Sequence, residues 1–321
     1  MFGHKAKVGV VIPIWNVASY IERCAESLMN QTLDDMQFVF VDDASPDNSI
    51  EILNAMLARH PERADQVSVV HHTCNKGLPS ARKTGLDLVN AEYVAHCDSD
   101  DWVEPNMYET MYLSACSNNA DMVVCSANAS QLVCGDDANL LKAFLHRKIY
   151  PVVWRRLTRT EIYRRVVFPK ENYFEDWVQG VQTHAYSRVV NVVPELLYHY
   201  NTNPSSITNL NDLENCEERL RQSMVNMKMV QDFVISNHLA TEDDLIYLKI
   251  RVRQRLSSKL MLRQGRKQYL NTYPEVNKAL FHCHYLPLDL KIEHVFICLN
   301  LYPEWIRYGK SAYRHLQRLI R

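Results

Sequence analysis

Short apolar runs alternate with segments of helical periodicity along the first part of the chain. Continuous apolar runs at positions 8–14 and 37–41 predict strands that are buried on both faces, as in a parallel sheet. Similar runs at 67–71 and 92–97 predict two more strands, and the segments between them place apolar residues at helical spacing. This alternation implies right-handed crossovers. We therefore predict an α/β fold with a Rossmann-like, mostly parallel sheet and helices on both faces.

The pattern becomes predominantly helical in the last third of the chain. From residue 213 onwards, apolar residues recur at the intervals of one helical face. Thr241 and Asp244 have the spacing of a capping box, which predicts the start of a further helix. We therefore expect a helical C-terminal region over 211–321 after an α/β domain over 1–210.

Composition is typical of a soluble globular protein and argues against nucleic-acid-binding, disulfide-rich and membrane-spanning classes. The 321 residues are 47% hydrophobic and 23% charged, and the net charge of −1 gives no electrostatic reason to expect nucleic-acid binding. The nine cysteines include no CxxC pair, so they are interpreted as reduced thiols in a cytoplasmic protein. We find neither a signal-peptide pattern nor a run of about 18 apolar residues that would span a membrane.

Acidic residues follow two of the predicted strands. Asp98, Asp100 and Asp101 lie within one short turn after the run at 92–97, and Asp42 and Asp43 end the run at 37–41. The carboxyl ends of parallel strands meet at one edge of a sheet, where such folds bind ligands. Clustered carboxylates are costly unless a cation or hydrogen bonds offset their charge, and a hard divalent ion prefers oxygen ligands. The alternative is a solvated turn, in which Asp and Ser are common in any case.

Six segments, in this order, resemble the motifs of family-two glycosyltransferases with the A-type fold. They are 10–16 (VVIPIWN), 38–49 (FVFVDDASPDNS), 75–86 (NKGLPSARKTGL), 91–105 (AEYVAHCDSDDWVEP), 174–177 (FEDW) and 197–208 (LYHYNTNPSSIT). The resemblance implies that the domain over 1–210 consists of a nucleotide-sugar-binding half, 1–115, and an acceptor-binding half, 116–210.

The resemblance also implies roles for individual residues of the donor site. Pro13, Trp15 and Asn16 would line the nucleotide pocket, with Trp15 near the base. Asp43 would accept a hydrogen bond from the base, usually uracil in this family, and Arg82 would approach the base or the diphosphate. The acidic turn would complete the site: Asp98 supports the turn, Asp100 lies near the ribose and the metal, and Asp101 binds the metal directly.

In the acceptor half, the resemblance makes Asp176 the general base, with Glu175 as the next choice. Asp176 is expected to begin a helix, where the macrodipole favours an ionised carboxylate. Ordinary helix N-terminal acidity is the alternative explanation for this Glu-Asp pair. Trp177 and His199 are weaker choices for contacts with the acceptor or diphosphate, because a histidine between two tyrosines is often structural. One departure from the family pattern, Ala44 in place of Gly, is expected to matter little if its φ is negative.

These roles imply an inverting hexosyl- or N-acetylhexosaminyl-transferase that needs Mn²⁺ or Mg²⁺. The donor would be a nucleotide sugar, with UDP expected, and the acceptor a saccharide or lipid-linked saccharide in surface polysaccharide or glycan synthesis. A divalent ion would neutralise charge on the diphosphate as it leaves, and one carboxylate would deprotonate the acceptor hydroxyl. Two alternatives stay open: a phospho-acceptor signalling domain, which would leave FEDW unexplained, and a catalytically inactive protein that binds nucleotide sugars.

The last twenty residues have a basic amphipathic pattern. Apolar residues of 302–321 fall on one side of a helical projection and five basic residues on the other. Such a helix suits the surface of an anionic membrane, which would make the protein peripheral on the cytoplasmic face. It would equally well pack its apolar side against the protein.

Overall fold

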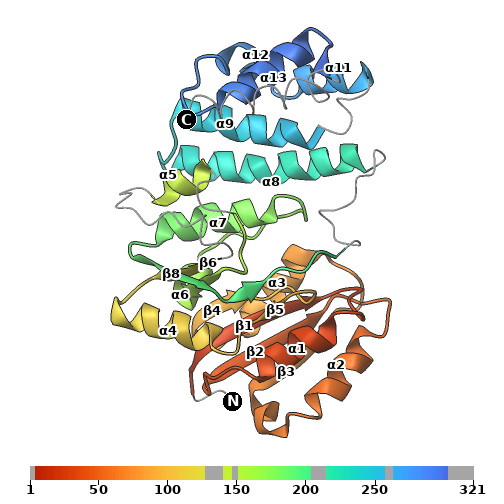
Figure 1. Ribbon diagram of the computed structural model, residues 1–321, viewed down its shortest axis with the longest axis vertical. Coiled ribbons are helices and arrows are strands. Elements are labelled where there is room, and N and C mark those ends of the chain that lie inside the picture. Colours follow the sequence, from red (N-terminus) through yellow and green to blue (C-terminus); the bar gives the residue numbers. More distant parts are fainter. Residues whose placement is uncertain (1–3, 127–139, 147–150, 204–214, 257–262, 303–321) are drawn as a thin grey trace, which may run out of the picture. The chain divides into compact units, whose positions relative to one another are not determined.

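The computed structural model describes residues 4–126, 140–146, 151–203, 215–256 and 263–302 (Figure 1). The chain forms two compact units, Met1–Ser206 and Ile207–Arg321. The first unit contains all the strands of the described residues, and the second is helical. The tail at 303–321, for which a membrane contact was predicted, lies outside the described residues.

A seven-stranded, mostly parallel sheet is the centre of the first unit. Its strand order is β3-β2-β1-β4-β7-β6-β8, and β5 and β9 form a separate antiparallel pair. The four neighbours β3, β2, β1 and β4 are parallel to one another, as the apolar runs predicted. The strands are β1 (Ala6–Ile14), β2 (Met36–Asp42), β3 (Val67–His71), β4 (Ala91–His96), β5 (Trp102–Val103), β6 (Met122–Ser126), β7 (Arg156–Arg159), β8 (Val190–Leu196) and β9 (Tyr198–His199).

Helices cover both faces of this sheet. Val10 and Ile12 of β1 lie in a hydrophobic cluster with residues of α1, α2 and α4, whereas Val11 lies in a cluster with residues of α3 and α6. The predicted α/β architecture is thus confirmed. The helices of the unit are α1 (Ile21–Met29), α2 (Ser49–Leu57), the 3-10 helix η1 (Pro61–Gln66), α3 (Leu78–Leu88), α4 (Met107–Ser117), α5 (Leu140–Leu145), α6 (Thr160–Tyr163) and α7 (Glu175–Tyr186).

Close packing of α3 on β1 fixes the helix that carries Arg82. A Cβ atom on Gly85 would lie 2.3 Å from Cγ1 of Val11, so only glycine allows this approach of helix and strand. Pro79 lies in the first turn of α3, where its missing N–H costs nothing. The position of Arg82 relative to the sheet therefore depends on the close contact between Gly85 of α3 and Val11 of β1.

The antiparallel strand β7 was not predicted. It pairs with β4 on one side and β6 on the other, and its sequence is Arg-Leu-Thr-Arg. Arg156 and Thr158 of this strand are nonetheless buried. Tertiary contacts rather than an apolar pattern place this segment in the sheet, which is why its basic composition concealed it.

The second unit is a set of helices with its own core. Its α-helices are α8 (Cys216–Ser236), α9 (Glu242–Arg253), α11 (Arg263–Asn271), α12 (Val276–Ala279) and α13 (Leu288–Cys298), and the 3-10 helix η2 (Gln254–Leu256) follows α9. The capping box predicted for α9 is confirmed, because Thr241 Oγ1 accepts from the Asp244 N–H and the Asp244 carboxylate accepts from the Thr241 N–H. Among the helices of the described ranges, none has the length and apolarity needed to cross a bilayer.

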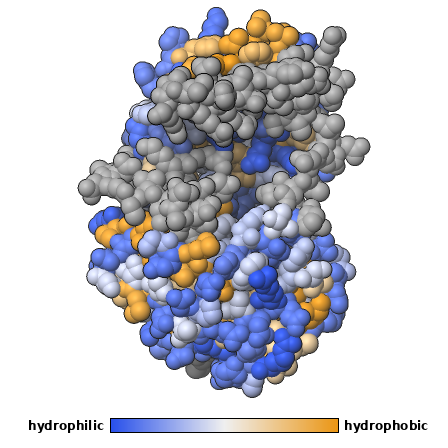
Figure 2. Space-filling model, viewed as in Figure 1, coloured by the Kyte–Doolittle hydropathy of each residue, from blue (hydrophilic) through white to orange (hydrophobic). Residues whose placement is uncertain are grey.

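The described surface is mainly polar on the face drawn in Figure 2, with apolar residues in small clusters. Small clusters of this kind are normal on globular proteins. An exposed aromatic side chain therefore needs a functional explanation only when it lies beside reactive groups.

Candidate active site

The acidic turn after β4 is fastened to β9 through Asp101. This side chain is 1% exposed, and both of its oxygens accept hydrogen bonds. The Tyr198 hydroxyl donates to Oδ2 at 2.6 Å, and the backbone N–H of Asn201 donates to Oδ1 at 2.7 Å. Burial, together with the negative charge of Asp98, raises the pKa of Asp101 to about 8. Asp101, for which direct metal binding was predicted, thus serves here as the internal partner of Tyr198.

Asp100, like Asp98, is partly exposed, whereas Asp101 is buried. Among described residues Asp100 accepts one side-chain hydrogen bond, from Asn203 Nδ2 to Oδ2 at 3.0 Å. Burial and the neighbouring Asp98 raise its pKa above the ordinary value. A carboxyl group whose charge is disfavoured in this way gains from any cation that approaches it.

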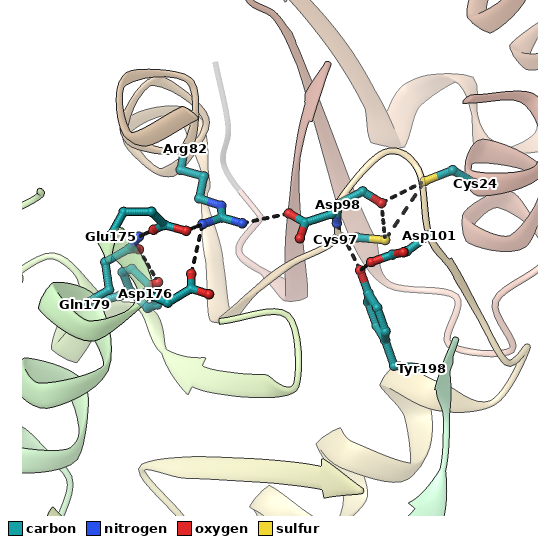
Figure 3. Close-up of polar contacts among 10 residues, drawn as sticks. Cys24, Arg82, Cys97, Asp98, Asp101, Glu175, Asp176, Gln179 and Tyr198 are labelled. Carbon is teal, nitrogen blue, oxygen red and sulfur yellow. Dashed lines mark hydrogen bonds and ion pairs between the residues drawn. The ribbon is translucent and has the colours of Figure 1, made fainter. Parts of the chain in front are cut away.

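Arg82 joins the two halves of the site. It is 1% exposed, and Nη2 donates to Asp98 Oδ1 at 2.6 Å (Figure 3). On its other side, Nη1 donates to Glu175 and, at 3.2 Å, to Asp176 Oδ1. Arg82 was predicted to approach the base or the diphosphate. Instead, its guanidinium lies between the acidic turn of β4 and the acidic start of α7.

Glu175 and Asp176 differ in their surroundings, although they are adjacent. Phe174, which precedes α7, has a φ of 65°, and this left-handed residue turns both acidic side chains toward Arg82. Glu175 also accepts from Gln179 Nε2 at 2.5 Å, and its side chain is 6% exposed. The side chain of Asp176 is 25% exposed. Asp176 is therefore the carboxyl group of the pair that a substrate can reach.

The surroundings of Asp176 oppose the effect of the helix start on its ionisation. Burial raises its pKa well above the ordinary range, and Glu175 raises it further, while Arg82 acts in the opposite direction. The helix macrodipole is worth about 0.3–1 kcal/mol and does not outweigh a second buried carboxylate in contact. A carboxylate with a raised pKa is also a stronger base once it is ionised.

At the nucleotide end, Asp43 organises the loop before α3. Its Oδ1 accepts from the Lys76 N–H at 2.8 Å and pairs with His72 Nδ1 at 2.7 Å, and its Oδ2 accepts from the Gly77 N–H at 2.8 Å. A carboxylate has about four acceptor positions, so one position, on Oδ2, is not used by these bonds, although Asp43 is only 3% exposed. His72 also bonds Thr84 Oγ1 at 2.9 Å and thereby helps to orient Asp43.

Trp15 and Asn16 lie at the carboxyl end of β1. Trp15 is 46% exposed, whereas Pro13 is buried within the strand. The Asn16 N–H donates to Ser45 Oγ at 2.8 Å, which ties the end of β1 to the loop after β2. In that loop Ala44 has a φ of 56°, so the condition of a negative φ is not met and this alanine is strained.

The two weaker acceptor choices are both engaged in internal contacts. Trp177 is 5% exposed and packs edge-on against Phe144, with ring centroids 5.4 Å apart. His199 Nε2 lies 2.5 Å from Glu104 Oε1, and its ring stacks on Trp102 at 5.1 Å. Trp177 offers almost no surface for an acceptor, and His199 has the structural surroundings that were its alternative interpretation.

A family model supplies the identity that this geometry suggests. Residues 9–180 match the model described as glycosyl transferase family 2, which spans more than half of the chain. The chain belongs to this family. The matched range includes Asp43, Arg82 and the acidic turn, and it ends just beyond Asp176.

Proteins with sequences similar to this chain are named as glycosyltransferases. The chain is 29% identical over 219 residues to the glycosyltransferase EpsH of Bacillus subtilis, and the match covers 62% of each protein. It is 35% identical over 117 residues to glycosyltransferase GlyG of Streptococcus pneumoniae, which covers 36% of this chain and 38% of GlyG. The chain thus spans about three fifths or less of the length of these relatives.

Solved glycosyltransferase structures share the fold. S. aureus TarS 1–349 in complex with UDP has a TM-score of 0.56 at 15% identity, with 94% of this chain and 92% of TarS 1–349 covered. The mannosyltransferase PcManGT from Pyrobaculum calidifontis, in complex with GDP-Man and Mn²⁺, has a TM-score of 0.56 at 17% identity and covers 96% of this chain and 84% of its own. This family member therefore has the A-type glycosyltransferase fold.

The donor set of the turn fits a cation that is carried largely by its substrate. Across the described ranges, no three His, Cys, Asp or Glu side chains come together in an arrangement able to hold a metal ion. Mg²⁺ and similar ions are commonly bound through one or two carboxylates, with substrate phosphates and water as the remaining ligands. Two hard oxygen donors, Asp98 and Asp100, satisfy that requirement.

Proposed function

We propose that this protein is a metal-dependent, inverting glycosyltransferase that transfers a sugar from a nucleoside-diphosphate sugar to a saccharide or lipid-linked saccharide. The observation that carries the proposal is the position of Arg82, whose guanidinium contacts Asp98 of the acidic turn and Asp176 at the start of α7. A donor-phosphate turn and a substrate-accessible base are thereby held on two sides of one buried cation. The surroundings suit glycosyl transfer, because leaving-group stabilisation and proton removal must occur close together.

The nucleotide would lie along the ends of β1 and β2. Trp15 offers an exposed aromatic face, and the remaining acceptor position of Asp43 suits an N–H on the edge of the base. Uracil has such an N–H and cytosine in its usual tautomer does not. UDP is therefore the nucleotide we propose, although guanine would also satisfy Asp43. The structurally similar PcManGT was solved with GDP-Man, so GDP-sugars should be tested beside UDP-sugars.

Asp100, with Asp98, would hold Mn²⁺ or Mg²⁺, in place of the direct role predicted for Asp101. A divalent ion held there would neutralise negative charge on the departing diphosphate. Arg82 donates to one oxygen of Asp98, and Asn203 donates to one oxygen of Asp100. The other oxygen of each carboxylate is the one we propose for the ion. Asp101 orders the turn from beneath by binding Tyr198.

Asp176 would remove the proton from the acceptor hydroxyl. One base and one departing diphosphate make a single displacement, which inverts the anomeric carbon. Glu175 is less suited to this role, because its oxygens are occupied by Arg82 and Gln179. We assign Glu175 to hold Arg82 and to raise the pKa of Asp176.

The test is a donor screen that measures release of nucleoside diphosphate in the presence of Mn²⁺, with and without chelator. UDP-sugars should be turned over, chelation should abolish turnover, and UDP should bind more tightly than CDP by calorimetry. Asp176→Asn should lower kcat by roughly a hundred-fold to ten-thousand-fold with little change in UDP affinity. Glu175→Gln is the matched control, expected to retain more activity and to move the rising limb of the pH profile to lower pH. Release of no nucleotide from any donor would leave the inactive binding protein as the better explanation.

A further inference from the structure

Three aromatic rings form a stacked column beside the acidic turn, which we call the Tyr200 ladder. Tyr198 stacks on Trp154 with ring centroids 4.1 Å apart and an interplanar angle of 18°. Trp154 stacks in turn on Tyr200, with centroids 6.1 Å apart and an angle of 19°. Tyr198 and Trp154 are buried, whereas Tyr200 is 52% exposed. The ladder thus supports one aromatic ring that remains open to a ligand.

The backbone on both sides of Tyr200 is held by the active-site turn. Tyr198 donates to Asp101 Oδ2 at 2.6 Å, and the Asn201 N–H donates to Oδ1 of the same carboxylate at 2.7 Å. Two residues further along, Asn203 Nδ2 donates to Asp100 at 3.0 Å. These bonds fasten the segment that carries Tyr200 to the turn that is proposed to bind the donor, and Trp154 supports the Tyr200 ring.

Large exposed aromatic side chains stabilise nothing by burial, so this well-supported ring suggests a ligand surface. The axial C–H groups of a pyranose ring form an apolar, weakly positive face that suits the negative face of an aromatic ring. Asn201, which follows Tyr200 in the sequence, carries a side-chain amide of the kind that bonds sugar hydroxyls. A flat lipid surface would not need this combination of one ring with a polar neighbour.

We infer that Tyr200 is the platform on which a pyranose ring of the acceptor stacks, with Trp154 and Tyr198 holding the platform in position. This inference rests on the proposed function, because it assigns the acceptor side of the same site. It replaces Trp177, whose ring is covered by Phe144, as the aromatic contact for the acceptor. Trp15, which follows the last residue of β1, is left to the nucleotide.

The test uses the full chain with saturating UDP and Mn²⁺ and a panel of methyl pyranosides of glucose, galactose, mannose and N-acetylglucosamine. Saturation-transfer NMR should show binding of at least one glycoside through its axial ring protons. Tyr200→Ala should weaken that binding by at least about ten-fold, and Tyr200→Phe should retain it, since stacking needs only the ring. Leu196→Ala is the matched control, because Leu196 is also 52% exposed.

Calorimetry with UDP on the same variants separates a ligand role from a structural one. UDP affinity should be unchanged in Tyr200→Ala. The inference is overturned if no glycoside binds the unmodified protein, if Tyr200→Ala retains normal glycoside binding, or if UDP and glycoside affinities fall together. Failure of the donor screen with glycoside binding intact would instead count against the proposed transferase activity alone.

Discussion

Replacement of Arg82 by methionine removes a buried cation that contacts both acidic segments. Among the described residues, Arg82 pairs with Asp98, Glu175 and Asp176, and it is 1% exposed. Methionine fills much of the volume of the side-chain stem but removes the ion pair that each of the three carboxylates makes with Arg82. The loss of folding stability should therefore come from the missing charge rather than from poorer packing.

The expected magnitude follows from the burial of this group. Removal of one partner of a buried ion pair costs about 3–5 kcal/mol, because the opposite charge is left uncompensated. The unit Met1–Ser206 is of the size in which each kcal/mol lowers Tm by about 2–4 °C. Arg82→Met should thus unfold about 6–20 °C below the unmodified protein at pH 7.5.

The deficit should shrink as the pH falls. Arg82 lowers the pKa of Asp176, which burial and Glu175 already raise above its value in the unfolded chain. Without the guanidinium that pKa is higher still, so the folded variant binds protons more readily than the unfolded chain. This contribution is fully present below the unfolded pKa and is lost as the pH rises through the folded pKa. Arg82→Met should therefore be closest to normal stability near pH 5 and furthest from it near pH 8.

Urea denaturation followed by circular dichroism at pH 5, 6.5 and 8 measures the effect, with Arg63→Met as the matched control. Arg63 is also buried, but its bonds go to the backbone carbonyls of Met29, Gln31 and Leu33 and to other uncharged acceptors. Its loss should cost stability with little dependence on pH. A deficit below 1 kcal/mol for Arg82→Met, or the same pH dependence in both variants, would refute the charge argument.

Three further predictions concern single residues. Asp100→Asn should weaken Mn²⁺-dependent UDP binding by more than about ten-fold in calorimetry, whereas Asp101→Asn should change it little and lower Tm instead. Ala44→Gly should raise the free energy of unfolding by about 0.5–1 kcal/mol because Ala44 has a φ of 56°, while Ala58→Gly, at a φ of −62°, should lower it. Burial lowers the pKa of His184 to about 3, so stability should fall as the pH drops below about 6.5, by about 2 kcal/mol at pH 5, and the acid limb should flatten in His184→Phe.

The first four strands could be predicted because each is a short run dominated by apolar residues, and β1 and β2 are buried on both faces. Strand β1 was predicted at 8–14 and extends over Ala6–Ile14, and β3 was predicted at its observed bounds. The capping box of α9 was equally local, since it depends on two residues three positions apart. Strand β7 could not be predicted from its own residues, because it is held by pairing with β4 and β6, which are distant in the sequence.

Motifs identified residues of the site but not their partners. Asp43 was predicted as a base contact, yet no local signal connects it to His72 or to the loop before α3. Asp101 and Tyr198 are 97 positions apart, and only the pairing of β5 with β9 brings them together. The role of a carboxylate depends on which donors reach it, and this depends on tertiary structure.

At Asp176, the stabilisation of a negative charge by the helix start is outweighed by the neighbouring carboxylates. The start of α7 does favour a negative charge, but that stabilisation is divided between Glu175 and Asp176, which stand side by side. Arg82 is shared in turn among these two carboxylates and Asp98, so its single positive charge cannot offset all three. The shortage of positive charge therefore belongs to the whole group. It raises the pKa of Asp176, whereas each oxygen of Glu175 already accepts a hydrogen bond, one from Arg82 and one from Gln179. A base whose charge is disfavoured before substrate binds and which retains an exposed edge is suited to take one proton from an acceptor and to release it afterwards.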